Sequence, residues 1–152
     1  MTIDTGLKQK ALTYLQAHNV MTLATSEADG VWAAAVFYVN DQFDLYFLSA
    51  RHTRHARHIA ATPRVAATIQ EDYKDWPEIK GIQLSGEVRL LDGEAQERAI
   101  ALYLKKYPFV ATSAELAPAL RRVNWYRLTC NTLYMIDNSL GLGHRDLVIG
   151  TG

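Results

Sequence analysis

The sequence predicts a mainly β fold in which five or six antiparallel strands form a split or closed barrel with a few short helices. Two observations support this prediction. Short runs rich in β-branched and aromatic residues follow one another, and brief polar turns such as Asp29-Gly30 separate them. The run from Ile82 to Leu90 alternates between apolar and polar side chains, which is typical of a strand with one covered and one wet face.

The first half of the chain is expected to open with a helix that begins at Asp4 or Thr5 and ends near Asn19. A turn at Asn40-Asp41 then joins two strands of a hairpin meander. Pro63 ends a short second helix, because proline cannot continue a helix interior. Strands are predicted at 20–25, 31–39, 43–48 and 65–69, and the second helix at 53–61.

The second half begins with an acidic and aromatic loop from Glu71 to Glu78. The alternating strand at 82–90 follows, and Asp92-Gly93 turns the chain into a helix at about 94–107 that Pro108 ends. A short helical turn at 114–120, a long strand at 125–136 and a tail from Asp137 complete the order. Without an internal repeat or a linker, the chain is predicted to be a single domain over residues 1–152.

Composition narrows the class of protein. The net charge of zero argues against a nucleic-acid or membrane-surface binder, since those need a broad basic face. The single cysteine, Cys130, excludes an internal disulfide framework and is expected to be a small buried residue rather than a nucleophile. The N-terminus has no signal-peptide pattern, and no apolar run approaches the ~20 residues of a membrane span. The cytoplasm is therefore the expected compartment.

The stretch from Arg51 to His58 holds three arginines and three histidines in eight positions. It lies between a strand and a helix start that offers Thr53 as a cap, so free N–H groups and the helix dipole favour an anion such as a phosphate there. A merely solvated helix face and a nucleic-acid patch remain alternatives. A metal site at His52, His55 and His58 is a further alternative, although the interleaved arginines would repel a cation.

The run from Val31 to Val39 is apolar on both faces. A strand with only one covered face would carry polar residues at every second position. Its outer face is therefore expected to be covered by a second subunit or by a flat ligand, which three consecutive alanines would allow to approach the backbone. A tightly packed internal strand explains the pattern equally well.

Two segments, 45–59 and 62–69, carry a resemblance to a known family. Thr53-Arg54-His55 matches a Ser/Thr-Arg-Lys triplet at a helix start, and Thr62 to Ala66 matches an Asn-Pro-x-Val-Ala segment before the next strand. In this order, the chain resembles the pyridoxamine 5′-phosphate oxidase-like superfamily of FMN-binding split barrels over roughly residues 8–137. The segments 81–87 and 137–143 further resemble a small bacterial branch, the YhbP-like proteins.

The resemblance implies a homodimer that holds FMN in a cleft between its subunits. Arg54 would clamp the phosphate as a fork, and Thr53 would donate a hydroxyl or backbone hydrogen bond to it. His55 stands where the family usually has lysine, so its charge would depend on pH. Ser49 matches a small hydroxyl residue at the strand end, near the ribityl chain or the phosphate.

The resemblance also implies where the flavin ring lies. Ala33, Ala34 and Ala35 match the strand against the isoalloxazine ring, and Gln83 would face the cleft from the neighbouring strand. No metal is expected, and no catalytic residue stands out.

The activity implied is that of a small flavin-dependent oxidoreductase with an organic substrate or electron donor, although turnover itself is left open. Pyridoxal phosphate synthesis is not expected, because the vitamin B6 oxidase has a C-terminal Arg-Leu-x-Pro and this chain ends Leu147 to Gly152. Arg127-Leu128 does not occupy the equivalent place. Two alternatives remain: a flavin or haem binder without turnover, serving as a carrier or sensor, and a deazaflavin-dependent reductase.

Overall fold

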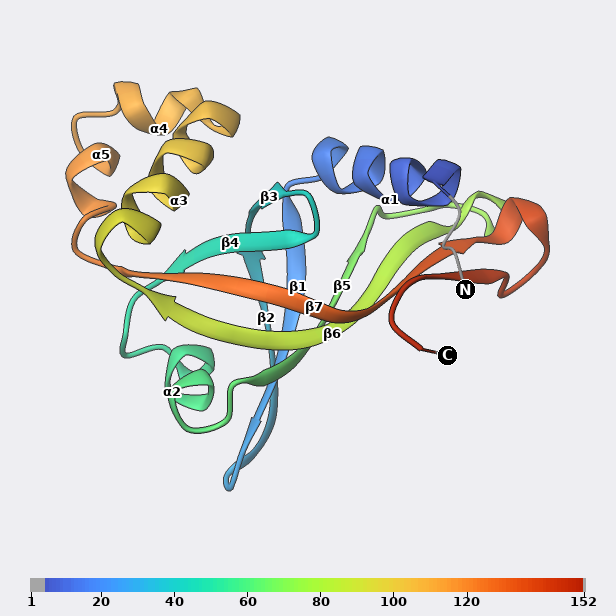
Figure 1. Cartoon of the computed structure of the whole chain (residues 1–152), viewed down its shortest axis with the longest axis horizontal. Coiled ribbons are helices and arrows are strands. Elements are labelled where there is room, and N and C mark those ends of the chain that lie inside the picture. The colour runs from blue at the N-terminus through green and yellow to red at the C-terminus, as the bar shows by residue number, and fades with distance from the viewer. Residues whose placement is uncertain (1–4, 152) are drawn as a thin grey trace.

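The computed structural model describes residues 5–151, which fold around one curled antiparallel sheet (Figure 1). Its strands are β1 (Val20–Glu27), β2 (Gly30–Phe37), β3 (Val39–Asp41), β4 (Asp44–Ser49), β5 (Arg64–Gln70), β6 (Lys80–Leu91), β7 (Asn124–Asp137) and β8 (Arg145–Ile149). The helices are α1 (Thr5–Ala17), α2 (Arg54–Ala61), α3 (Gly93–Lys106), α4 (Pro108–Thr112) and α5 (Leu116–Ala119), with 3-10 turns η1 (Trp76–Glu78) and η2 (Asn138–Leu140).

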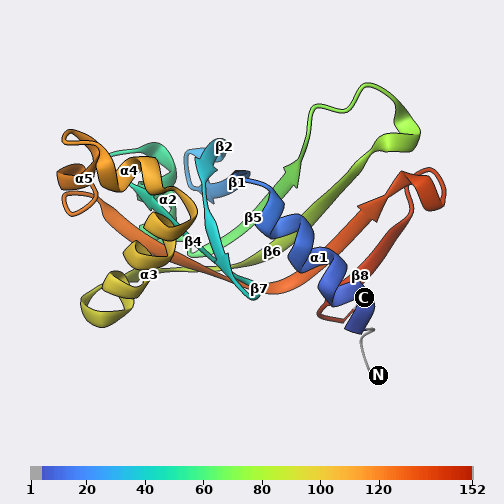
Figure 2. The same ribbon diagram turned by 90° about the horizontal axis from the view of Figure 1, so that it is seen from above.

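The strand order is β2-β1-β5-β6-β7-β4-β3, and β8 pairs with β7 outside this path. Because β2 runs directly into β3, the two ends of the sheet are joined by the chain and the sheet closes only partly, as a split barrel. Strands β6 and β7 form its longest pair and extend from the helical lobe of α3–α5 at one end to η1 and η2 at the other (Figures 1 and 2). The predicted mainly β split-barrel class is confirmed.

Two apolar clusters stabilise the fold. The larger one lies inside the barrel, under α1 and α2, and contains Leu15, Leu23, Phe47 and Leu128, none of which is exposed. The smaller one joins α3–α5 to the outer side of β4 and β7 and is centred on Trp125, whose indole N–H donates to the Leu120 carbonyl. The barrel cluster supports α2, so it fixes the position of the cationic stretch.

Several sequence predictions need correction. The predicted strand 31–39 is two strands that break at Tyr38, whose fully buried ring turns inward while its N–H donates to the Asn19 carbonyl. Asn40-Asp41 belongs to β3, and the turn lies at Gln42, which has a φ of +53°. Asp4, offered as a helix start, lies outside the described residues, whereas Thr5 begins α1.

Three further corrections concern the second half. Leu90 is 62% exposed, because the end of β6 leaves the barrel core and turns Leu91 into the smaller cluster instead. Pro108 ends α3 and also begins α4, where its missing N–H costs nothing. The tail contains strand β8, which pairs with β7 through Leu147 and Ile149; its apolar run was too short to predict.

Candidate functional site

Three side chains predicted to hold a phosphate lie together where β4 meets α2. The Ser49 hydroxyl is 2.7 Å from His55 Nε2 and 3.0 Å from the Thr53 hydroxyl. The Thr53 hydroxyl is in turn 3.3 Å from His55 Nε2. We call Ser49, Thr53 and His55 the hydroxyl–histidine cluster. The sequence brings them together because β4 ends at Ser49 and the chain makes a tight turn before α2 begins.

Thr53 is the N-cap of α2. Its hydroxyl accepts a hydrogen bond from the Ala56 N–H at 3.2 Å and donates one to the Ala50 carbonyl at 3.0 Å. The first N–H groups of a helix have no acceptor within the helix, and the helix dipole adds positive potential there. The cluster therefore combines hydroxyl donors, a ring nitrogen and helix N–H groups in one place.

His55 is the titratable member of the cluster. Desolvation by burial lowers its pKa below the ordinary histidine value. The ring is therefore mainly neutral near pH 7, and one nitrogen is free to donate or accept as its tautomer allows. A phosphate beside it would favour the charged form.

Arg54, the fourth predicted phosphate residue, points to the opposite side of α2. Its guanidinium lies 4.5 Å over the Trp32 ring, and its buried Nε is 3.5 Å from Asp29 Oδ2. The same carboxylate lies 2.8 Å from Nε2 of His58, which is buried and whose other ring nitrogen is 3.0 Å from the Thr25 hydroxyl. We call Asp29, Arg54 and His58 the hairpin clamp, because it fastens the β1–β2 turn to α2.

The alanines of β2 divide between two sides of the sheet. Ala34 is half-buried on the inner side, where Val36 packs against the barrel core, whereas Ala33 and Ala35 are exposed on the outer side. Strand β2 ends the sheet path, so the interpretation as an internal strand is wrong, and its second edge is unpaired within the described sheet. Val31 and Phe37, 80% and 51% exposed, continue the outer row.

Gln83 also lies on the outer side, but not on a strand next to β2. The pairing runs from Ala35 to Thr22 on β1, Thr68 on β5 and Gln83 on β6, so two strands separate it from the alanines. The expectation of a neighbouring strand is therefore wrong, because β1 and β5 lie between β2 and β6. Gln83 and the hydroxyl–histidine cluster lie on different sides of the sheet.

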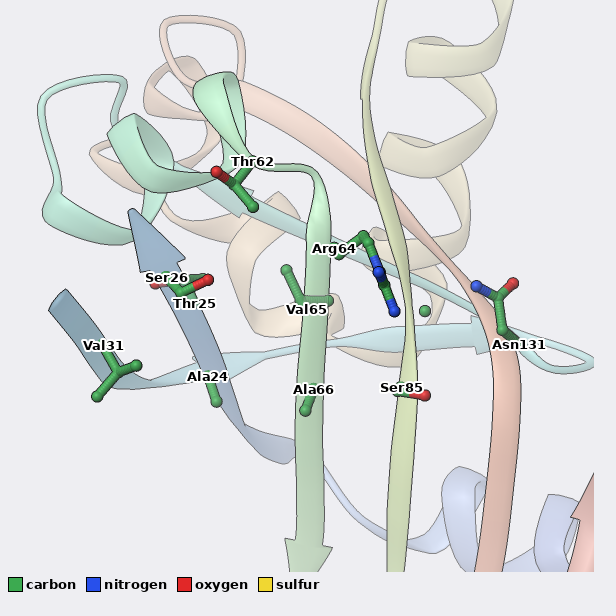
Figure 3. Close-up of a pocket in the computed structure, with 11 residues that line it drawn as sticks. Ala24, Thr25, Ser26, Val31, Thr62, Arg64, Val65, Ala66, Ser85 and Asn131 are labelled. Atoms are coloured by element: carbon green, nitrogen blue, oxygen red, sulfur yellow. The ribbon is translucent and has the colours of Figure 1, made fainter. Parts of the chain in front are cut away.

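The outer side carries a shallow cavity of about 450 Å³ (Figure 3). Small side chains from four adjacent strands line it, among them Val31, Ala24, Ala66 and Ser85, and Arg64 is its only cationic residue among those described. Small residues leave the backbone accessible, so this face suits a flat ring or a second sheet. In the sequence, Arg64 stands out only as part of a motif, and Asp29 only as part of a turn.

The remaining histidines and Cys130 have other surroundings. His55 contacts Ser49 whereas His58 contacts Thr25 and Asp29, and no group of three His, Cys, Asp or Glu side chains within residues 5–151 is arranged to hold a metal. Burial raises the pKa of the Cys130 thiol to about 12, so it is a poor nucleophile. Over the same residues, no helix is long and apolar enough to cross a membrane.

Comparison with known proteins identifies the family. The model of the pyridoxamine 5′-phosphate oxidase family matches residues 7–137. The chain belongs to this family. A UPF0306 protein of Photorhabdus laumondii is 37% identical over 134 residues, which cover 87% of this chain and 88% of the relative. The resemblance inferred from Thr53–His55 and its flanking strands is thus confirmed.

Solved structures confirm the fold of this family member. HutZ, the haem storage protein from Vibrio cholerae, superposes with a TM-score of 0.69 at 20% identity and covers 84% of this chain and 92% of its own. A haem-binding protein from Mycobacterium smegmatis gives a TM-score of 0.77 at 20% identity, with 98% of this chain and 60% of that chain covered. Both names refer to haem, and at 20% identity the likeness shows a shared split-barrel fold.

Proposed function

We propose that this member of the pyridoxamine 5′-phosphate oxidase family binds FMN non-covalently and acts as a small flavin-dependent oxidoreductase. The observation that carries the proposal is the hydroxyl–histidine cluster at the start of α2. Hydroxyl donors and helix N–H groups suit a phosphate ester, and no carboxylate of the described residues contacts the cluster to compete with it.

The flavin ring would lie along β2. Its unpaired edge offers backbone N–H and C=O groups, which match the alternating donors and acceptors on the pyrimidine side of a flavin. Ala33, Ala34 and Ala35 add little side-chain bulk, so a planar ring can approach the backbone. The exposed Val31 and Phe37 would then meet a second copy of the chain, which closes the cleft as a homodimer.

FMN, when bound, supplies the electron or hydride transfer, and the chain's own residues bind and orient it. Ser49 and Thr53 would donate to phosphate oxygens, and Arg54 would leave the hairpin clamp or extend past it to add a charged contact. A small organic molecule would be the reaction partner. A flavin ring bound between β2 and β4 would be shielded from water by these two strands.

Titration of the purified protein with FMN and with riboflavin tests this proposal. A phosphate site predicts that FMN binds more tightly than riboflavin and that Ser49→Ala removes part of this difference, whereas Thr13→Val on the exposed face of α1 leaves it unchanged. A protein that is colourless as purified, and that binds no FMN when FMN is added in excess, would refute the proposal.

A second candidate is a haem binder without turnover, which the names of the two haem-related structures favour. His55 would then be the first residue to test as a ligand of the haem iron. Addition of hemin should produce a Soret band that His55→Ala shifts or removes. A deazaflavin would use the same phosphate site, so competition between it and FMN separates those two cofactors.

A further inference from the structure

Two parts of the surface take no role in the proposed FMN site, and the first is a groove beside α2. It has a volume of about 490 Å³ and separates α2 from the ends of β6 and β7. Ile59, Val88 and the 62% exposed Leu90 give it an apolar lining, and Arg51 and Arg57 are the exposed cations among its residues. We call it the α2 groove.

The second part is a tip formed by the loop from Glu71 to Glu78 and the turn after β7. The two are fastened together, since the Asn138 amide donates to the Trp76 carbonyl at 3.0 Å. Trp76 is 70% exposed, and Leu140 and Leu142 beside it are also exposed. The tip loop carries four acidic residues and one lysine, and Lys74 is paired with Asp72 at 3.3 Å.

The tip and the α2 groove are complementary in two respects. One presents an exposed indole and the other an apolar recess; one is acidic and the other cationic. Because the chain has zero net charge, the acidic tip and the cationic groove are local features and not part of an overall charge of one sign. In both views α2 lies in the half of the molecule that holds α3–α5, whereas the tip lies at the other end of the paired strands β6 and β7 (Figures 1 and 2). The two parts therefore cannot meet within one chain.

We propose that the tip of one copy docks in the α2 groove of a second copy. Trp76 lies on Ile59, Val88 and Leu90, and the carboxylates of Asp72 and Glu78 face Arg51 and Arg57. A two-fold axis uses the contact twice, because each copy supplies one tip and one groove. The inference rests on the homodimer of the proposed function, and it adds a second contact between the two copies to the one that Val31 and Phe37 of β2 would make.

Charge reversal tests the contact. In sedimentation velocity at low salt, the groove variant Arg51→Glu/Arg57→Glu and the tip variant Asp72→Lys/Glu78→Lys should each dissociate about tenfold more readily than the unaltered protein. Mixed together, the two variants should associate again. One contact then joins the acidic groove of the first variant to the basic tip of the second, and the other contact joins the unaltered tip to the unaltered groove. Trp76→Ala should weaken association without any change of charge.

Lys8→Glu/Lys105→Glu is the matched control, since it changes the net charge as much as the groove variant does at two exposed lysines elsewhere. It should leave the dimer intact. A monomeric unaltered protein, or reversed variants that associate normally or do not recover when mixed, would overturn the inference. The measurement needs no flavin: a protein that binds FMN but fails this test loses only the interface, and a colourless dimer that passes it loses only the cofactor.

Discussion

Helix α2 has two polar sides, and they differ in whether a carboxylate is present. Toward the β1–β2 hairpin, Asp29 contacts both Arg54 and His58. Toward β4, Ser49, Thr53 and His55 contact one another, and no carboxylate among the described residues joins them. Side chains that already have a carboxylate partner mainly hold the structure together, whereas grouped donors without one remain available to an anion.

The largest effect is expected from His58 in the hairpin clamp. His58→Ala removes a buried ring and leaves the Thr25 hydroxyl without its partner, so the free energy of unfolding should fall by about 2–4 kcal/mol. Urea denaturation measures the change. His144→Ala removes a partly exposed ring with its own aspartate partner, Asp146, and should cost less than about 0.5 kcal/mol. Equal costs for the two variants would refute the structural role of the clamp.

Arg54 is the residue that can belong to both sides. If it reaches the phosphate, Arg54→Ala should weaken FMN binding by about 1.5–3 kcal/mol and riboflavin binding much less. Isothermal titration with the two ligands gives the comparison. A loss of unfolding free energy with no selective loss of FMN would assign Arg54 to the hairpin clamp alone.

Much of this difference between the two sides of α2 could not be predicted from the sequence. Local sequence patterns predict the order of the strands along the chain, the cap at Thr53 and the closeness of Ser49 to α2, and tertiary packing does not reverse them. The direction of the Arg54 side chain does not follow from local patterns. It depends on Asp29, which lies 25 residues earlier in the chain and reaches α2 only once the β1–β2 hairpin has folded against that helix. The expectation that Gln83 lies on a strand next to β2 was wrong for the same kind of reason, because the order of strands in the sheet places β1 and β5 between β2 and β6.

Ser49 tests the side without a carboxylate. Ser49→Ala removes a hydroxyl from the hydroxyl–histidine cluster but neither a cap nor a charge, so FMN affinity should fall by about 1 kcal/mol while the unfolding midpoint changes little. Flavin fluorescence quenching measures the first quantity and urea denaturation the second. Thr53→Ala should lower both, since the N-cap contributes about 1 kcal/mol to helix stability. If Ser49→Ala instead lowered stability and spared affinity, the cluster would be structural as well.

The smallest effect is expected from the charge of His55. Burial lowers the pKa of this ring, so the free protein gains a positive charge here only as the pH falls below the ordinary histidine value. A bound phosphate stabilises the charged form, and FMN affinity should therefore rise as the pH falls from 8 to about 6. The FMN phosphate titrates near pH 6 itself, so the pH profile of His55→Gln gives the ligand's own contribution, which must be subtracted.

His55→Lys carries its charge throughout this range and should bind FMN more tightly than the unaltered protein at pH 8, by about 1 kcal/mol or less, with a flatter profile. Identical profiles for His55, Gln and Lys at this position would place the phosphate away from the cluster, and the contrast between the two sides of α2 would then no longer predict where the ligand binds.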